Sequence, residues 1–175
     1  MLIARDCQLA NAPYLRKVRL VDASWVQGID TPVGDSLTIP DGCFLFKPGA
    51  DFIDIEFANK GASYTETLEP SPSGPTYIAE LLVEVPRDSP SEGLSVSKLA
   101  NRKFVALMRD ANGVCKVAGT VKQPLLFAYT VSAADKNAWN FVFSSTQKQQ
   151  APYINGIDDT ELYRYFSNEF SFLFS

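Results

Sequence analysis

The chain has 175 residues, of which 46% are hydrophobic and 21% are charged, and its net charge is −4. A chain of this length can bury roughly 70% of the surface that it exposes when unfolded, so we expect one domain that folds without disulfides or metals. The sequence pI of about 4.8 and the lack of any long run of Lys or Arg disfavour tight nucleic-acid binding by a basic face.

Cysteine and histidine usage argues against two kinds of stabilising site. Cys7, Cys43 and Cys115 are odd in number and widely spaced, and the chain contains no histidine. We therefore expect free, buried thiols in a protein that folds in the cytoplasm, and neither a disulfide framework nor a zinc site. Asp6 comes too early for a signal peptide, and no segment reaches the roughly 20 apolar residues of a membrane span. The sequence thus predicts a soluble protein with no membrane span.

The first fifty residues contain one predicted strand, near Lys17–Val21, followed by turn clusters rich in Gly and Pro. Trp25 is expected to pack into the core or onto a neighbouring subunit. From about Asp51 to Tyr153 the pattern then alternates with period two, which is typical of β-strands that have one face on a core.

Three hairpins are predicted in this region. The first begins with a strand at Asp51–Phe57, in which Ile53, Ile55 and Phe57 face inward, and continues with strands at Tyr64–Glu69 and Thr76–Val85. In the last of these strands, one face is predicted to be shared by Tyr77, Ala79, Leu81, Val83 and Val85. Pro70, Pro72 and Pro75 cannot donate ladder hydrogen bonds, so the loop that contains them should project as a stiff, exposed tip.

The second and third hairpins follow a connection at Pro86–Asn101, for which one helical turn around Leu94–Leu99 is expected. Lys103–Met108 pairs with Val114–Gly119 through an Asp-Ala-Asn-Gly turn, and Leu125–Val131 pairs with Ala138–Ser144. In the third hairpin Leu125, Phe127, Tyr129 and Val131 line the same face as Trp139, Phe141 and Phe143. Such cross-strand pairs add roughly 0.2–1 kcal/mol each, so this hairpin is expected to form the centre of the sheet.

The sequence after Pro152 changes character. Eight of its last fourteen residues are large and apolar, too many to leave in water, so they are expected to pack on the parent domain or on another subunit. A spacing of four suits a helical stripe, whereas Phe170-Ser-Phe-Leu-Phe equally suits a strand. We therefore predict a β domain over residues 1–153 and a C-terminal arm over residues 154–175. The fold class is mainly β: an antiparallel β-sandwich or barrel built from successive hairpins, with little helix.

The residue types needed for catalysis are sparse. Without histidine the commonest general base is missing, and no glycine-rich phosphate loop is present. A carboxylate pair such as Glu66 with Glu80 remains open, although a solvated strand face explains these acids more simply. The sequence thus assigns no catalytic, cofactor-binding or metal-binding residue and predicts a protein that is not an enzyme.

The segment from Phe52 to Tyr153 resembles a group of small β-rich proteins from the neck and tail modules of tailed bacteriophages and prophages. Four signatures carry the resemblance: Phe57-Ala-Asn-Lys-Gly-Ala62 followed by Tyr64-Thr-Glu66, the strand that ends Val83-Glu-Val85-Pro86, Arg102-Lys-Phe-Val-Ala-Leu before an Asp-x-Asn-Gly turn, and a closing Trp-x-Phe-x-Phe strand. These are mostly turn and strand signatures, and they cover about 100 of the 175 residues.

The resemblance implies a virion structural protein, assembled in the host cytoplasm, that forms a homo-oligomeric ring at the phage neck or tail. Tail tube, tail terminator and head–tail adaptor stay open as its position. Its partners would be other neck or tail proteins. DNA would pass at most transiently through the channel, and no cofactor or small-molecule substrate is expected.

Two groups of residues are predicted to make the contacts between subunits. They are the apolar arm residues Leu162, Tyr163, Phe166, Phe170, Phe172 and Phe174, and the tip residues Pro70, Pro72 and Pro75. The alternative is a ligand-binding β-sandwich module of a fibre or baseplate, which would recognise carbohydrate or protein. Its candidates for stacking on a sugar are Trp25, Tyr64, Tyr77 and Trp139.

Overall fold

A computed structural model describes residues 14–29, 37–39, 44–72, 74–86, 90–132 and 137–158. The elements in chain order are β1 (Leu15–Asp22), η1 (Ala23–Trp25), β2 (Val26–Ile29), β3 (Phe44–Phe46), β4 (Phe52–Asp54), β5 (Ala62–Glu69), β6 (Thr76–Pro86), α1 (Pro90–Leu99), β7 (Lys103–Asp110), β8 (Cys115–Ala118), β9 (Leu125–Ser132), β10 (Ala138–Gln147) and β11 (Tyr153–Ile154). The prediction of a mainly β, antiparallel fold is confirmed. In the described ranges, no helix combines the length and apolar character needed to cross a bilayer.

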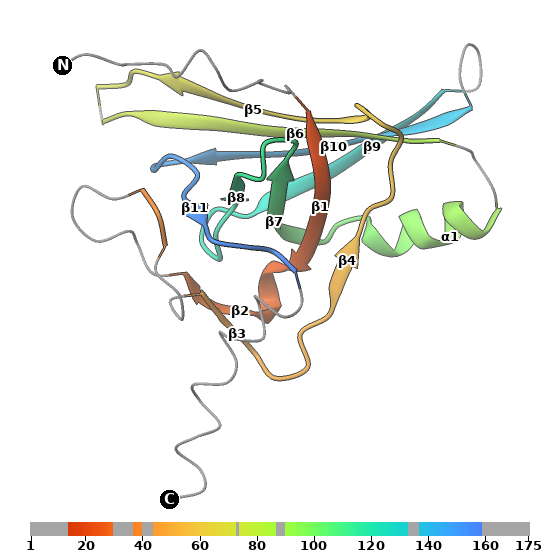
Figure 1. Ribbon diagram of the computed structural model, residues 1–175, viewed down its shortest axis with the longest axis horizontal. Coiled ribbons are helices and arrows are strands. Elements are labelled where there is room, and N and C mark those ends of the chain that lie inside the picture. The colour runs from red at the N-terminus through yellow and green to blue at the C-terminus, as the bar shows by residue number, and fades with distance from the viewer. Residues whose placement is uncertain are drawn as a thin grey trace, which may run out of the picture.

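Within the described residues, nine strands form one branched antiparallel sheet, which is not closed into a barrel. One part, here called layer A, has the strand order β5-β6-β10-β9. The other part, layer B, contains β4, β1, β7, β8 and β11. The two layers join where β7 pairs with β9, at Phe104 opposite Leu125 and Lys103 opposite Leu126. Figure 1 shows the strands of layer A crossing β1 and β7 steeply, as in orthogonally packed sheets.

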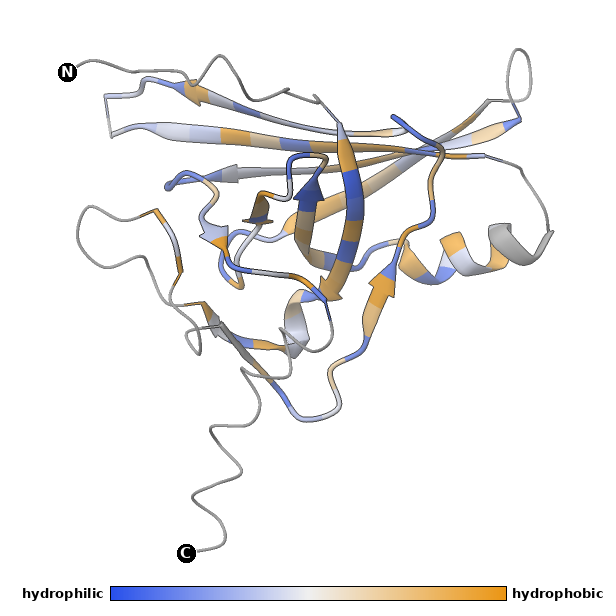
Figure 2. Cartoon of the chain, in the orientation of Figure 1, coloured by the Kyte–Doolittle hydropathy of each residue, from blue (hydrophilic) through white to orange (hydrophobic). Residues whose placement is uncertain are grey.

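The space between the layers is filled by the inner core. Layer B contributes Val18 and Leu20 from β1 and Phe104, Ala106 and Met108 from β7. Layer A contributes the inward-facing residues of its alternating strands, namely Ala62, Leu81, Val83, Leu125, Trp139, Phe141 and Phe143. Hydrophobic and hydrophilic residues accordingly alternate along β1 in Figure 2. Burial of this apolar face, at about 25 cal/mol per Å², is the main force that holds the two layers together.

Within the β5–β6 and β9–β10 hairpins the side chains share faces as predicted. The first predicted strand, β4, instead pairs with β1 and, among the described strands, not with β5. Tyr77 to Val85 alternate on the core side of β6, and β10 aligns Trp139 with Val131 and Phe143 with Phe127. The rings of Phe127 and Phe143 stack with centroids 5.0 Å apart, and Phe104 meets Phe143 edge-on at 5.8 Å. As predicted, β10 lies in the middle of layer A, between β9 and β6.

Three predicted features need correction. The strand expected at Asp51–Phe57 is only Phe52–Asp54, although Ile53, Ile55 and Phe57 do pack against the inner core. The expected helical turn is a helix of ten residues, α1. The third correction concerns layer B, which is covered on both faces.

The outer face of layer B is buried under a second group of residues, here called the outer core. Val105 and Leu107 of β7 lie there, beneath residues from the β2–β3 hairpin and the segment that ends with Ile157. The backbone of Ile39 bonds to that of Tyr153, which fixes the covering segments to one another. Trp25 packs against the edge of this core, which agrees with the first of its two predicted locations, the core or a neighbouring subunit.

Candidate functional site

The strand β9 has an edge that is only partly used. Its first two residues, Leu125 and Leu126, pair with β7, and residues Leu126 to Ser132 pair with β10 on the other side. Beyond Leu126, residues 127–132 therefore have no described strand on the β7 side. Their sequence, Phe-Ala-Tyr-Thr-Val-Ser, contains no charge, Pro or Gly. Protein sheets usually protect such edges with Lys, Pro or a bulge, and β9 has none of these over this stretch.

Apolar side chains flank this open edge. Tyr129 and Val131, on the core side of β9, are 43% and 45% exposed, whereas Trp139 opposite Val131 is 7% exposed. The rings of Tyr129 and Trp139 lie 5.3 Å apart between centroids, and helix α1 passes over the indole at Gly93. Leu94, the next residue of α1, is largely exposed. We call Tyr129, Val131 and Trp139 the apolar shelf.

The indole of Trp139 has an unmet requirement. Its Nε1 is buried and has no hydrogen-bond partner among the described residues. A buried N–H without an acceptor costs roughly 1–3 kcal/mol, so this position favours an acceptor supplied from outside the described residues.

Unlike the two faces of layer B, the outer face of layer A exposes apolar side chains to solvent. Leu82 and Leu126 are exposed there, and the register of β5 and β6 places Glu69, Glu80 and Glu84 on the same face. No Lys or Arg occupies an outward position of the four strands, so this face is acidic.

The predicted contact residues divide into two groups. Pro70, Pro72 and Pro75 lie exposed in the turn between β5 and β6, at the end of the long hairpin in Figure 1, as predicted for a projecting tip. The six arm residues, Leu162, Tyr163, Phe166, Phe170, Phe172 and Phe174, lie outside the described residues. Of the predicted arm, residues 154–158 are described, and Ile154 and Ile157 are buried in the outer core.

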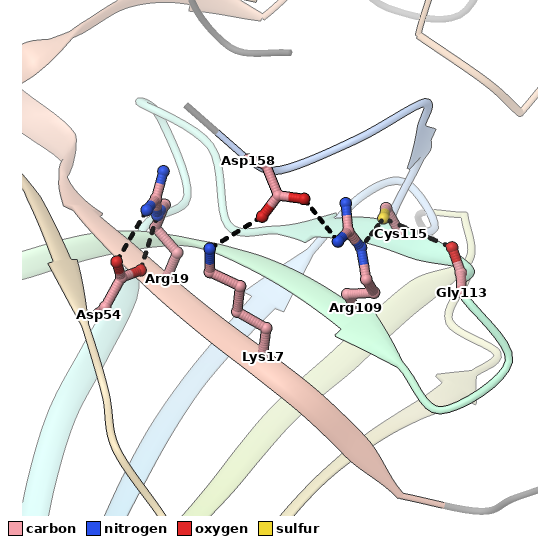
Figure 3. A network of polar contacts seen from close by, with 7 residues as sticks. All are labelled: Lys17, Arg19, Asp54, Arg109, Gly113, Cys115 and Asp158. Carbon is pink, nitrogen blue, oxygen red and sulfur yellow. Dashed lines mark hydrogen bonds and ion pairs between the residues drawn. The ribbon is translucent and has the colours of Figure 1, made fainter. Parts of the chain in front are cut away.

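A network of ion pairs fixes the start of this C-terminal segment (Figure 3). Asp158 accepts a hydrogen bond from Lys17 Nζ at 2.9 Å and another from Arg109 Nη1 at 2.7 Å. These bonds, that of Lys17 first, hold the pKa of the Asp158 carboxyl below its usual range. Arg109 also donates from Nε to the sulfur of buried Cys115 at 3.4 Å. The network therefore ties Asp158 to β1 and β7 on the outer face of layer B.

Beside this network, Arg19 forms a second ion pair. Its Nε and Nη2 donate to the two carboxylate oxygens of Asp54, each at 2.7 Å, and its guanidinium lies over the ring of Phe52. The Arg19 side chain is 5% exposed and that of Asp54 is 49% exposed. The hydrogen bonds from Arg19 lower the pKa of Asp54 against the opposing effect of burial. This pair joins β1 to the short strand β4.

We expect Asp54→Asn to lower the free energy of unfolding at pH 7 by about 1–3 kcal/mol, since it removes the carboxylate that accepts two hydrogen bonds from the buried guanidinium of Arg19. The value is below that of a fully buried pair because water reaches Asp54. Because the folded-state pKa of Asp54 is lowered, its contribution is present above the unfolded pKa of about 3.9 and is lost as the pH falls through the folded value. Denaturant unfolding from pH 7 to pH 3 should therefore show the difference between variant and wild type shrinking below about pH 5.

Asp51→Asn provides the matched control, because Asp51 is exposed three residues earlier in the chain. It should change stability by less than about 0.5 kcal/mol at any pH in this range. Equal effects of the two substitutions would show that the Arg19–Asp54 pair contributes nothing specific.

The structure separates the residues that the alternative predictions had grouped. Glu66 faces the inner side of layer A and accepts the backbone N–H of Ala151 at 2.7 Å, whereas Glu80 lies on the opposite face. Tyr77 and Trp139 lie opposite Gln147 and Val85, eight positions apart along β10, which is roughly 26 Å. The described geometry therefore brings together neither the carboxylate pair nor a single aromatic platform. Among the described residues, no group of three or more His, Cys, Asp or Glu side chains is placed to hold a metal ion.

Sequence reasoning identified the aromatic residues of β9 and β10 but not the shelf. It placed Tyr129 and Val131 in the core, where alternation puts them, yet the described residues leave both half-exposed because the hairpin extends beyond layer B. The missing signal was length: the third hairpin is longer than the second, so part of its inner face has no strand of layer B beneath it. No family model, curated protein or solved structure matches this chain.

Proposed function

We propose that this protein is a non-enzymatic structural subunit that assembles into a homo-oligomeric ring, in the neck or tail of a tailed bacteriophage. The observation that carries the proposal is the open, uncharged edge of β9 beside the exposed side chains of the apolar shelf. A strand edge of this kind is a template for pairing with another chain.

Assembly into a ring needs two different surfaces on one subunit, because a head-to-tail contact closes only when unlike patches meet. The described residues offer several unlike patches: the β9 edge, the acidic outer face of layer A and the proline tip at the far end of the β5–β6 hairpin. A rigid body with two cores keeps these surfaces at fixed angles. Fixed angles favour a closed ring with a defined number of subunits.

The bacteriophage setting is supported by the resemblance of residues 52–153 to small neck and tail proteins. It is also compatible with the charge of the molecule. An acidic face such as that of Glu69, Glu80 and Glu84 repels phosphates, which would let DNA pass a channel without being held. Tail tube, terminator and adaptor subunits all fit this description.

The proposal is tested by a charge placed at the edge. Val131→Lys should raise the dissociation constant of the oligomer by about tenfold or more, because burying an unpaired ammonium group at a subunit contact costs several kcal/mol. Val121→Lys is the matched control: Val121 is 44% exposed against 45% for Val131, but it lies in the turn before β9. Light scattering and native mass spectrometry over a concentration series would measure both variants.

A wild-type chain that stays monomeric at the highest accessible concentration would contradict the ring. Saturable binding of a glycan or a foreign protein by that monomer would instead favour the binding-module alternative. Equal weakening by the two lysine substitutions would show that the contact lies elsewhere than at the β9 edge.

A further inference from the structure

We propose that the open edge of β9 and the apolar shelf bind the C-terminal segment, residues 159–175, of a neighbouring copy of the chain, which adds there as an extra strand of layer A. The inference rests on the proposed ring and names the occupant of its contact. It depends on four observations: the backbone of β9, the composition of the segment, the indole of Trp139 and the position of Asp158.

The backbone of β9 requires a strand-like occupant. Over residues 127–132 the groups on the β7 side have no described strand opposite them, while the β10 side is fully paired as far as Ser132. Backbone N–H and C=O groups that become buried must be hydrogen-bonded. An added strand supplies all of these bonds at once, which is how extended peptides bind exposed sheet edges.

The composition of the segment suits this edge. The last charged residue of the chain is Glu169, and the following Phe-Ser-Phe-Leu-Phe-Ser alternates aromatic with smaller residues. In an added strand Phe170, Phe172 and Phe174 would share one face, because side chains alternate with period two. Facing the shelf, these rings would cover Tyr129 and Val131, which are about half-exposed in the isolated subunit.

The β5 edge of a neighbouring copy is the competing occupant and fits less well. β5 carries Glu66 and Glu69, and its sequence ends at the proline-containing turn. Charges and prolines are the devices that keep a sheet edge from pairing. The uncharged edge of β9 is therefore better matched by the uncharged end of the chain than by β5.

The indole of Trp139 needs an acceptor at the same place. Its buried Nε1, next to Tyr129 and beneath α1, has no partner in the described part of the chain. A backbone carbonyl of the incoming segment would supply an acceptor, because its serines alternate with the aromatic rings and would face away from the shelf. The shelf thus offers both apolar surface and one directional hydrogen bond.

The position of Asp158 favours a neighbour over the same chain as donor. Asp158 is held by Lys17 and Arg109 on the outer face of layer B (Figure 3). The shelf, by contrast, lies on the inner side of layer A. A segment from the same subunit would have to pass around the body. Residues 159–175 span at most roughly 55–60 Å when extended, enough to reach an adjoining subunit without that detour.

Disulfide cross-linking between two populations of full-length chains tests the inference. Both populations carry Cys7→Ser and Cys43→Ser, which leaves buried Cys115 as the native thiol. One population then carries Val131→Cys and the other Phe172→Cys, so that the engineered heterodisulfide forms only between copies and only if their Cα atoms come within about 7 Å. We expect the mixed, reassembled oligomer to give several-fold more of the heterodisulfide, identified by peptide mass spectrometry, than a Val121→Cys population mixed with Phe172→Cys.

A third pairing separates this inference from the proposed function. If Val131→Cys cross-links to Thr65→Cys of β5 in preference to Phe172→Cys while the oligomer stays intact, the edge is occupied by β5 and the inference is wrong. No excess over the Val121→Cys control in an intact oligomer would also overturn it and leave the ring standing. A chain that never assembles would overturn the inference and the ring together.

Discussion

Leu125→Ala should lower the free energy of unfolding by about 2–5 kcal/mol, one of the two largest effects that we expect from a single substitution. Leu125 is fully buried at the point where β9 meets β7, opposite Phe104. The joint between the two layers depends on its packing, because these are the residues through which layer A continues into layer B. Truncation to alanine would lose the hydrophobic stabilisation that comes from burying the removed methyl groups. It would also leave a cavity that the crossed layers cannot easily close.

Leu126→Ala is the control for this experiment. It makes the same chemical change one residue later, but Leu126 faces outward and is 56% exposed. It should alter stability by no more than about 0.5 kcal/mol. Denaturant unfolding of both variants, followed by tryptophan fluorescence, would give the two values. Similar values would contradict the placement of the joint, because a one-residue shift in register exchanges the two side chains.

Gly119→Ala should destabilise the fold by about 2–4 kcal/mol. Gly119 has φ +84°, where a side chain costs roughly 1–2 kcal/mol. A Cβ atom there would also lie 3.0 Å from the carbonyl oxygen of Phe104 and 3.2 Å from Cγ of Leu125. Crowding of this kind costs typically 1–3 kcal/mol more, and the nearest obstacle is backbone that cannot rotate away.

Gly113→Ala separates the two causes. Gly113 has φ +86°, nearly the same value, but a Cβ there would meet nothing within 4 Å. Its cost should be the conformational part alone, about 1–2 kcal/mol. Combining Gly119→Ala with Leu125→Ala removes one of the three crowding atoms, Cγ of Leu125, so the double variant should be less destabilised than the sum of the single changes. Equal costs at Gly113 and Gly119, or strict additivity, would show that the crowding at Gly119 is unimportant.

The hairpins were predictable because their signals are local. Alternation over Thr76–Val85 determines which side chains of β6 share a face, and the Asp-Ala-Asn-Gly turn joins β7 to β8 with Gly113 at positive φ. Each signal needs only neighbouring residues, and the register of a strand follows from which face is apolar.

The two-sided burial of layer B was not predicted, although one signal was present. Residues 104–108 of β7 read Phe-Val-Ala-Leu-Met, a continuous apolar run, and all five are essentially inaccessible. Runs of this kind indicate a strand that is covered on both faces. The covering segments, however, come from both ends of the chain, and nothing local in the sequence indicates that they return to this strand.

The candidate site depends on the same kind of distant information. Asp158 meets Lys17 across 141 residues, and Asp54 meets Arg19 across 35. The open edge of β9 exists because β7 diverges after two paired residues, a result of the crossing of the layers. Sequence patterns specify the strands but not the angle between the layers. The lack of charge in residues 127–132 therefore could not be interpreted as an open strand edge until the neighbouring strands were placed.

The burial of β7 on both faces also bears on how this protein can diverge. A strand with one solvent-exposed face tolerates change at every second position, whereas each of residues 104–108 of β7 must fit into one of two separate cores. Only substitutions that conserve volume are readily accepted in such a setting. Evolutionary drift in this chain should therefore be slowest along β7 and fastest on the outward positions of β5 and β6, whatever assembly the protein belongs to.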